Sequence, residues 1–153
     1  MKLDFATPED LVKLTTIGVT MFMESPHYSR FTYDPGKVFD ILSLCVGTEK
    51  GVAVVLRDDN GEVVGGLIGV VEEHWFGHSK MAYDIAFFIL PEYRHGRWGI
   101  KLIQAFVESA KEKGADEVQL TNTSGVMSER VEKLIEYCDF TRVGGMFYKV
   151  TGE

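Results

Sequence analysis

Apolar residues recur in this chain at two different spacings, and the spacing separates expected helices from expected strands. After the threonine-proline pair Thr7-Pro8, apolar residues repeat every three or four positions as far as Pro26, which predicts an amphipathic helix. The same spacing predicts a second helix from Asp34-Pro35 to about Cys45. The first third of the chain is therefore expected to supply two helices after a short strand at 2–5.

Short apolar runs predict the strands of one sheet. Asn60-Gly61 lies between two such runs and is a strong hairpin signal, and Gly65-Gly66 indicates a bulge or a close backbone approach. The run from Ile85 to Leu90 is apolar in both phases of the alternation, so both faces of that strand should be buried. Seven strands are expected, at 2–5, 52–57, 62–71, 81–90, 117–121, 140–143 and 146–150.

Two further helices are expected in the second half of the chain, the first of them ending near Gly114. The apolar positions that mark them are Ile103, Phe106, Val107 and Ala110, and then Val131, Leu134, Ile135 and Cys138. No repeat, linker or low-complexity segment interrupts the chain. The order of elements predicts one mixed α/β domain over residues 1–153.

The amino-acid composition of the chain limits the classes of function that it can have. The 153 residues are 45% hydrophobic and 25% charged, which is ordinary for a soluble domain able to bury a core. The net charge of −7 argues against general nucleic-acid binding and would tolerate a cationic amine substrate. We see no signal peptide and no run of membrane-spanning length, so we expect a cytoplasmic protein without a membrane partner. Cys45 and Cys138 fall on apolar helix faces and are expected to be buried thiols.

The segment from Ile89 to Ile100 joins the most apolar strand to a helix and is the strongest functional signal. Such a join aims free backbone N–H groups and the positive end of a helix dipole at one point, which suits a phosphate. Arg94 and Arg97 would add positive charge, whereas Gly96 and Gly99 could also serve only a tight turn. Neither a Rossmann fingerprint nor a P-loop is present.

Pro91-Glu92-Tyr93-Arg94 and the glycine-bearing loop after it resemble motif A of the GCN5-related N-acetyltransferases (GNAT). Arg94 and Gly99 match the first and last positions of that motif, and Arg97 stands at its middle glycine. The resemblance implies acetyl-CoA as co-substrate, with its pyrophosphate at the loop and its thioester beside the preceding strand. The residues implied in these contacts are Phe88, Ile89, Leu90, Arg94, His95, Gly96, Arg97, Trp98, Gly99 and Ile100.

The resemblance covers nearly the whole chain, including its ending from Phe140 to Tyr148. It implies a single-domain GNAT-like fold, with a mixed, mostly antiparallel sheet of about seven strands and about four helices. Glu24-Ser25-Pro26-His27-Tyr28 and the His-Trp-Phe at 74–76 look most like small acetyltransferases encoded by bacteriophages. A homodimer is a further possibility.

Asp84 is the candidate general base. Its carboxylate lies in an otherwise apolar strand, where burial would raise its pKa, and the family often places a glutamate near this point. Acetyl transfer needs a neutral amine, and a lysine-like amine is only about 0.1% deprotonated at neutral pH, so a base would help. The alternative is a buried aspartate that only bonds neighbouring groups.

Two loops are candidates for the acceptor side. His27 and Tyr28 lie in the segment that family members place over the substrate, and Glu72 and Trp75 lie in a loop that could hold an amine by carboxylate and cation–π contacts. Both loops could instead be solvated connections. The other titratable groups of the second loop, alternative bases, are Glu73, His74 and His78. We expect no metal there, because no helix brings the two histidines together.

The family's usual general acid is missing. Many GNAT enzymes carry a tyrosine in the last helix, thought to protonate the CoA thiolate, and the corresponding residue here is Ile135. Tyr137 is about 200° away around a helix. Tyr148 or water could substitute, or the chain could be a weakened enzyme, since a thiol with a pKa near about 8.5 leaves readily.

We therefore expect an N-acetyltransferase that moves an acetyl group from acetyl-CoA to a primary amine of a small molecule, peptide or protein. One alternative is a non-catalytic acyl-CoA-binding regulator with the same fold. A more distant alternative is a small phosphate-binding interaction domain.

Overall fold

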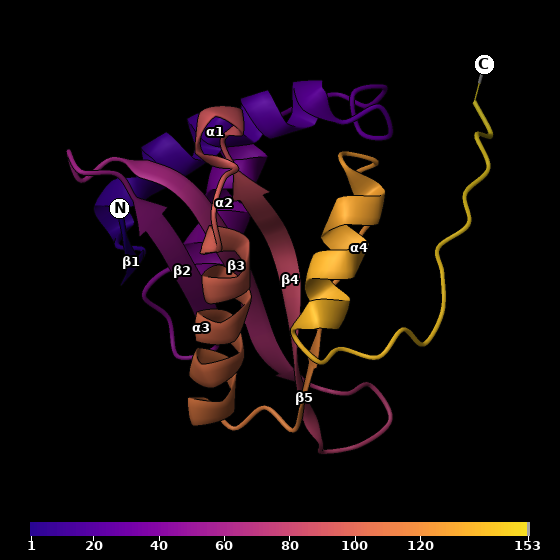
Figure 1. Cartoon of the computed structure of the whole chain (residues 1–153). Helices are drawn as coiled ribbons and strands as arrows, with labels where there is room; N and C mark the ends of the chain where they lie inside the picture. Colours follow the sequence, from indigo (N-terminus) through magenta and orange to yellow (C-terminus); the bar gives the residue numbers. More distant parts are fainter. Residues whose placement is uncertain (153) are drawn as a thin grey trace.

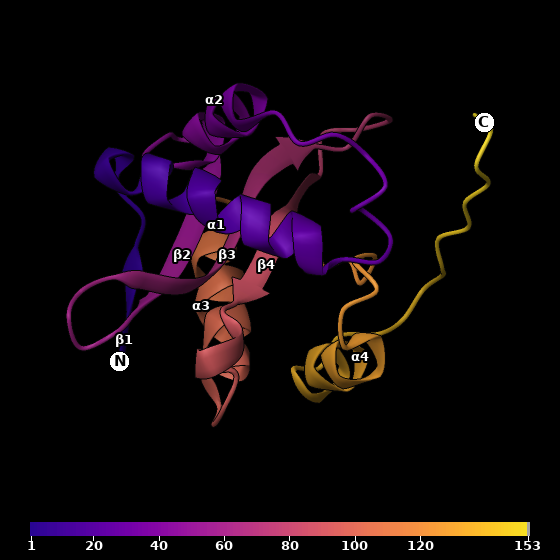
Figure 2. The same ribbon diagram turned by 90° about the horizontal axis from the view of Figure 1, so that it is seen from above.

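A twisted sheet separates two pairs of helices in the computed structural model, which describes residues 1–152 (Figures 1 and 2). Within those residues the sheet has five strands in the order β1-β2-β3-β4-β5. The first four strands are antiparallel to their neighbours, and β5 runs parallel to β4. The strands are β1 (Lys2–Phe5), β2 (Gly51–Arg57), β3 (Val63–Glu73), β4 (Lys80–Ile89) and β5 (Glu117–Gln119).

The helices cover the two faces of the sheet. Figure 2 shows α1 and α2 on one face and α3 and α4 on the other. Short 3-10 turns precede α1 and α3. The helices are α1 (Leu11–Glu24), α2 (Pro35–Cys45), α3 (Trp98–Glu112) and α4 (Ser128–Tyr137), and the turns are η1 (Pro8–Asp10) and η2 (Pro91–Tyr93).

The core lies on both sides of β2 and β3, because these strands are apolar in both phases of the alternation. Val55 and Ile68 pack toward α1 and α2, whereas Leu67 packs toward α3, where Phe106 is fully buried. Buried Cys45 belongs to the first of these clusters, and burial raises the pKa of its thiol to about 11. Cys138 is only partly buried. None of the described helices is long and apolar enough to cross a membrane.

A bulge in β4 lies among residues that line the candidate active site described below. Ile68 pairs with Ala86 and Gly69 pairs with Asp84, so Ile85 has no partner on β3. A Cβ atom at Gly69 would lie 2.1 Å from the carbonyl oxygen of Tyr83, so only glycine allows this approach. A second register shift lies beside Gly65, in the segment where the glycine pair predicted one.

The prediction of seven strands was wrong. Residues 140–143 and 146–150 are extended, but they leave α4 and run away from the sheet (Figure 1). A positive φ of 65° at Asp139 redirects the chain, and an ion pair from Arg142 to Glu132 at 2.9 Å holds the segment to α4. Strand propensity alone does not form a strand when no partner strand lies alongside.

Arg57 joins three N-terminal elements. Its guanidinium donates to Asp10 at 2.8 and 2.9 Å and to Asp4 at 2.9 Å, and the side chains of Arg57 and Asp10 are largely buried. The hydrogen bond from Arg57 is the largest cause that holds the pKa of Asp10 below its usual value. Stability from this pair is therefore present above roughly pH 4 and is lost as the pH falls through the depressed pKa.

Asp10→Asn is expected to lower the free energy of unfolding by about 1–3 kcal/mol at neutral pH, because it removes a charge-assisted pair. Urea unfolding at neutral pH and at about pH 3 measures this, and the difference from wild type should shrink in acid. Asp59→Asn is the matched control, since Asp59 is almost fully exposed. An equal loss in both variants would contradict the assignment.

Candidate active site

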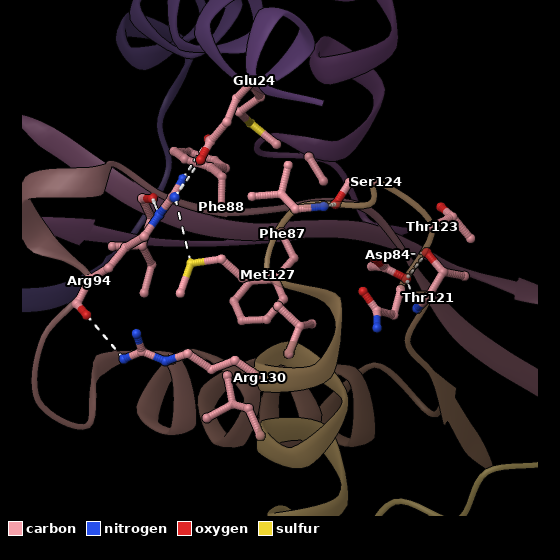
Figure 3. Close-up of a pocket in the computed structure, with 18 of the residues that line it drawn as sticks. Glu24, Asp84, Phe87, Phe88, Arg94, Thr121, Thr123, Ser124, Met127 and Arg130 are labelled. Carbon is pink, nitrogen blue, oxygen red and sulfur yellow. Dashed lines mark hydrogen bonds and ion pairs between the residues drawn. The ribbon is translucent and has the colours of Figure 1, made fainter. Parts of the chain in front are cut away.

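A cavity of about 390 Å³ opens between β4 and α4. β5 pairs with β4 only from Met81 to Tyr83, and beyond this point the cavity is lined by β4 on one side and by the loop at 121–127 and α4 on the other. The volume lies in the range of small-ligand sites. The end of α1 and the start of α3 complete the walls. Figure 3 shows Glu24, at the end of α1, among the labelled side chains.

The glycine-bearing loop lies at this cavity. Gly96 has a φ of 70°, a conformation that favours glycine, and α3 begins two residues later at Trp98. The first helical hydrogen bond is from the N–H of Lys101 to the oxygen of Arg97 at 3.1 Å, so the three preceding N–H groups have no acceptor inside the helix. Gly96 and Gly99 both line the cavity, as does His95.

Arg94 lines the same cavity but is bound by the protein itself. Its Nε donates to the oxygen of Ile89 at 2.6 Å, and its two Nη atoms donate to Glu24 at 2.5 and 2.6 Å. The hydrogen bonds from Arg94 hold the pKa of Glu24 below its usual value. In this structure Arg94 ties the end of β4 to the end of α1, and its charge is compensated by Glu24.

Two cations that sequence analysis missed lie on α4. Arg130 and Lys133 line the cavity, and Arg130 donates to the carbonyl oxygen of Arg94 at 3.2 Å (Figure 3). They are three residues apart, so they share a helix face. This spacing was available in the sequence, but Arg130 preceded the first apolar position used to mark that helix. Both cations therefore line the same cavity as Gly99 at the start of α3.

Four of the ten residues implied in cofactor contacts do not line the cavity: Leu90, Arg97, Trp98 and Ile100. Arg97 is exposed and its Nη2 lies 3.4 Å from the hydroxyl of Tyr137, whereas Trp98 packs against the core with the Lys101 ammonium 4.2 Å from its ring. Ile100 is half-buried outside the cavity. The middle position of the motif therefore supplies no direct cavity contact.

β4 also presents backbone donors to the cavity. The N–H of Leu90 donates to Val64 on β3, and backbone groups alternate in direction along an antiparallel strand. The N–H groups of Ile89 and Phe87 therefore point away from β3, consistent with the Ile89 oxygen that meets Arg94. Both residues line the cavity. Of the predicted segment from Phe88 to Leu90, only Ile89 offers a free donor, and Phe87 adds a second.

Asp84 lies in the cavity wall at the bulge, next to the loop after β5. Its carboxylate accepts from the backbone N–H of Thr121 at 2.8 Å and from the Thr121 hydroxyl at 3.3 Å (Figure 3). Burial raises the pKa of Asp84 above its ordinary value, and the two hydrogen bonds from Thr121 oppose that rise in part. The carboxylate thus has structural partners and faces the cavity as well.

The segment after α1 forms one rim of the cavity. Tyr28 lines it, and its hydroxyl bonds the hydroxyl of Thr123 at 2.5 Å, while Ser25 donates to the backbone oxygen of Ser124. His27 lies on the outer side of this segment, with its ring 4.7 Å from that of Tyr148. Tyr28 therefore lines the cavity, and His27 does not.

The β3–β4 hairpin lies away from the cavity. Glu72 accepts from the hydroxyl of Tyr83 at 3.0 Å, and Trp75 at the tip is 88% exposed. The structure does not bring these predicted acceptor residues together with Asp84. Within residues 1–152, no cluster of three or more His, Cys, Asp or Glu side chains is arranged to hold a metal ion.

Ile135, at the position of the usual tyrosine, packs against the core and not into the cavity. Tyr137 lies beside Arg97, and Tyr148 stacks beneath the Arg30 guanidinium at 4.3 Å, so neither lines the cavity. The tyrosine hydroxyl that does line it belongs to Tyr28.

The fold and the cavity define an α/β protein that can hold a phosphate-bearing ligand beside a strand with free N–H donors. Residues 19–140 match the acetyltransferase (GNAT) family model, which is more than half of the chain. The chain belongs to the GNAT family. Curated protein sequences give no significant match.

Solved structures with this fold are distant in sequence. An aminoglycoside acetyltransferase from an uncultured soil metagenomic sample, in complex with sisomicin, is 19% identical, with 98% of this chain and 96% of that chain covered and a TM-score of 0.70. A ribosomal-protein-alanine N-acetyltransferase from Brucella melitensis biovar Abortus is 14% identical, with coverage of 99% and 98% and a TM-score of 0.71. A transcriptional regulator from Bacillus halodurans is 18% identical, with coverage of 97% and 98% and a TM-score of 0.75.

Proposed function

We propose that this protein transfers an acetyl group from acetyl-CoA to the primary amine of a small molecule, in the cytoplasm and without a metal. One observation carries the proposal: the free N–H groups at the start of α3 and those of Phe87 and Ile89 serve the same cavity. The first set suits the pyrophosphate of CoA, and the second suits a carbonyl oxygen that gains negative charge. Family membership supports the same reaction.

The proposed phosphate-binding groups and the proposed catalytic groups lie at two different ends of the cavity. At the α3 end, Gly96 and Gly99 allow the phosphates to approach the backbone, and Arg130 and Lys133 supply positive charge. At the β4 end, the N–H groups of Phe87 or Ile89 polarise the thioester carbonyl. The amine attacks the carbonyl carbon, the C–S bond breaks, and the amine loses one proton while the thiolate leaves.

Asp84 is the proposed acceptor of that proton. Asp84 lies three positions before Phe87, which is about 10 Å along a strand, so we place water between the amine and the carboxylate. The raised pKa of Asp84 makes it a better proton acceptor than an exposed aspartate. No tyrosine on α4 lies in the cavity to protonate the thiolate, so this proton comes from Tyr28 or from water.

The acceptor is proposed to be a cationic small molecule because the chain carries a net charge of −7. Aminoglycosides belong to this chemical class, and one structure with the same fold is an aminoglycoside acetyltransferase. The more specific similarity to bacteriophage enzymes remains a proposal based on the segments at 24–28 and 74–76. The matched structures described above come from bacteria or soil metagenomes.

A screen of amine acceptors that measures CoA thiol release tests the reaction. Release that depends on an amine supports an enzyme. Thermal stabilisation by acetyl-CoA without thiol release from any amine would favour the non-catalytic regulator. Stabilisation by inorganic phosphate but not by acetyl-CoA would favour the phosphate-binding domain.

Arg94→Ala is expected to weaken acetyl-CoA binding by roughly 1–3 kcal/mol, because it leaves the Glu24 carboxylate unpaired beside the incoming phosphates and releases the loop from Ile89. Glu24→Gln is the matched control: it removes the negative charge and keeps an acceptor for Arg94. Calorimetric titration should show a large loss in the first variant and little loss in the second. Unchanged affinity in Arg94→Ala would contradict the role of this pair.

A further inference from the structure

The cavity contains a carboxylate that the proposed reaction does not use. Within residues 1–152, the acidic side chains that line the cavity are Glu24 and Asp84, and Asp84 is the proposed proton acceptor. The same cavity is lined by the cations Arg94, Arg130 and Lys133. These cations would repel a second positive charge on the acceptor, whereas Glu24 would attract it.

Arg94 covers the Glu24 carboxylate in this structure. Its two Nη atoms donate to the two carboxylate oxygens at 2.5 and 2.6 Å, as the dashed lines in Figure 3 show, while its Nε donates to the oxygen of Ile89 at 2.6 Å. Nη1 also lies 3.9 Å from Sδ of Met127, at the start of α4. The guanidinium thus lies between the end of α1 and the end of β4, and it masks Glu24 from any other cation.

An incoming pyrophosphate competes with Glu24 for Arg94. Gly96 and Gly99, at the proposed phosphate site, follow Arg94 closely in the chain and line the same cavity. The side chains of Arg94 and Glu24 are 23% and 30% exposed, and an ion pair that stays in contact with water contributes little free energy. A phosphate accepts paired hydrogen bonds from a guanidinium as a carboxylate does, and it adds its own charge. Acetyl-CoA can therefore draw Arg94 away from Glu24 at little cost.

We propose that Glu24 binds a second ammonium group of the acceptor, and that acetyl-CoA uncovers this carboxylate by drawing Arg94 to its phosphates. The inference rests on the proposed acetyl transfer, and it narrows the acceptor to a molecule with two amines. Ile89, whose oxygen holds Arg94, lies two positions after Phe87, which is about 7 Å along a strand. For a thioester at the N–H of Phe87, the reacting amine and the second ammonium are therefore about 7–10 Å apart.

The two substrates then strengthen each other's binding. The cofactor uncovers Glu24 for the ammonium group, and the ammonium group neutralises a carboxylate that would otherwise repel the phosphates. By thermodynamic linkage, each ligand must raise the affinity of the other by the same factor. A diamine should therefore bind weakly without the cofactor and tightly with it, whereas a monoamine of the same length should not respond.

Calorimetric titration of a matched pair of amines tests the proposal. The probes are cadaverine, which has an amine at each end of its carbon chain, and n-pentylamine, which has the same chain and one amine. CoA takes the place of acetyl-CoA, because it carries the same phosphates and permits no turnover. Saturating CoA should raise the affinity for cadaverine at least about 10-fold and that for n-pentylamine less than about 2-fold.

Three variants separate the roles of the ion pair. Arg94→Ala leaves Glu24 uncovered, so without CoA this variant should bind cadaverine at least about 5-fold more tightly than the wild type does. Glu24→Gln should still bind CoA but should lose the preference for cadaverine over n-pentylamine. Glu92→Gln is the matched control, because Glu92 is exposed, lies close to Arg94 in the chain and does not line the cavity, and it should keep the wild-type response.

An equal effect of CoA on the two amines would overturn the proposal, and so would a preference for cadaverine that survives Glu24→Gln. If Arg94→Ala without CoA binds cadaverine no better than the wild type does, Glu24 is not masked and the exchange is rejected. The acetyl-transfer proposal has a separate readout. Thiol release from acetyl-CoA that is as efficient with monoamines as with diamines would sustain that reaction and reject the second ammonium site. The expected response of cadaverine to CoA, without thiol release from any amine, would support the Glu24 site in a non-catalytic protein.

Discussion

Gly99→Glu is expected to abolish measurable acetyl-CoA binding, a loss of at least 100-fold by calorimetry. Gly99 lies at the start of α3 and lines the cavity, where its N–H has no acceptor within the helix. A carboxylate there would repel the pyrophosphate and fill the space that the phosphates need. The secondary structure seen by circular dichroism should be unchanged.

Gly99→Ala is the control that separates bulk from charge. A Cβ atom at Gly99 would lie 2.8 Å from Cδ2 of Leu134, which is the tip of a flexible side chain, so alanine should require only a small shift of the Leu134 side chain. We expect a modest loss of affinity for alanine and a complete loss for glutamate. Equal affinities in the wild-type and Gly99→Glu proteins would remove the α3 terminus from the cofactor site.

Asp84→Asn is expected to lower kcat/KM about 10²–10⁴-fold near neutral pH, the usual range for a lost general base. Asparagine can still accept from the N–H of Thr121, so acetyl-CoA affinity should stay nearly unchanged. Stability should not fall: burial disfavours the ionised form of Asp84, so its charge destabilises the fold at neutral pH, and the neutral amide removes that cost.

The pH dependence identifies the role of Asp84. In the wild type, activity should fall as the pH drops through the pKa of Asp84, which burial places above the ordinary aspartate value. In Asp84→Asn the deficit should shrink at high pH, where the amine loses its proton without help. Glu72→Gln is the control, because Glu72 lies outside the cavity. Full activity of Asp84→Asn at neutral pH would leave Asp84 with a structural role only.

The parts of the fold that depend on local pattern could be predicted from the sequence. The helix from Pro35 and the strand ending at Ile89 follow from apolar spacing and from a proline at a helix start, and both lie where predicted. The glycine loop could be predicted for the same reason, since a positive φ at Gly96 is a local requirement. These features need no knowledge of the rest of the chain.

The parts that depend on distant partners could not be predicted in the same way. The pairing of Arg94 with Glu24 spans 70 residues, and it changes Arg94 from an expected phosphate ligand into a link between α1 and β4. Strand formation at 140–143 and 146–150 depends on a partner strand, which local propensity does not reveal. The residue types around Trp75 suggested that it belongs to the acceptor side. Because β3 and β4 are long, however, the hairpin that joins them ends away from the cavity, and Trp75 does not line it.

The bulge at Ile85 also determines which side of the sheet each later residue of β4 faces. Tyr83 and Ala86 both pack toward α1 and α2 although they are three positions apart, because the unpaired residue shifts the alternation by one. If Ile85 instead paired with Ile68 in a regular ladder, every side chain from Ala86 onward would face the opposite side of the sheet. Phe88 would exchange its place with Phe87, and the two N–H groups now facing the cavity would turn toward β3. The extra residue at the bulge therefore sets which N–H groups of β4 face the cavity.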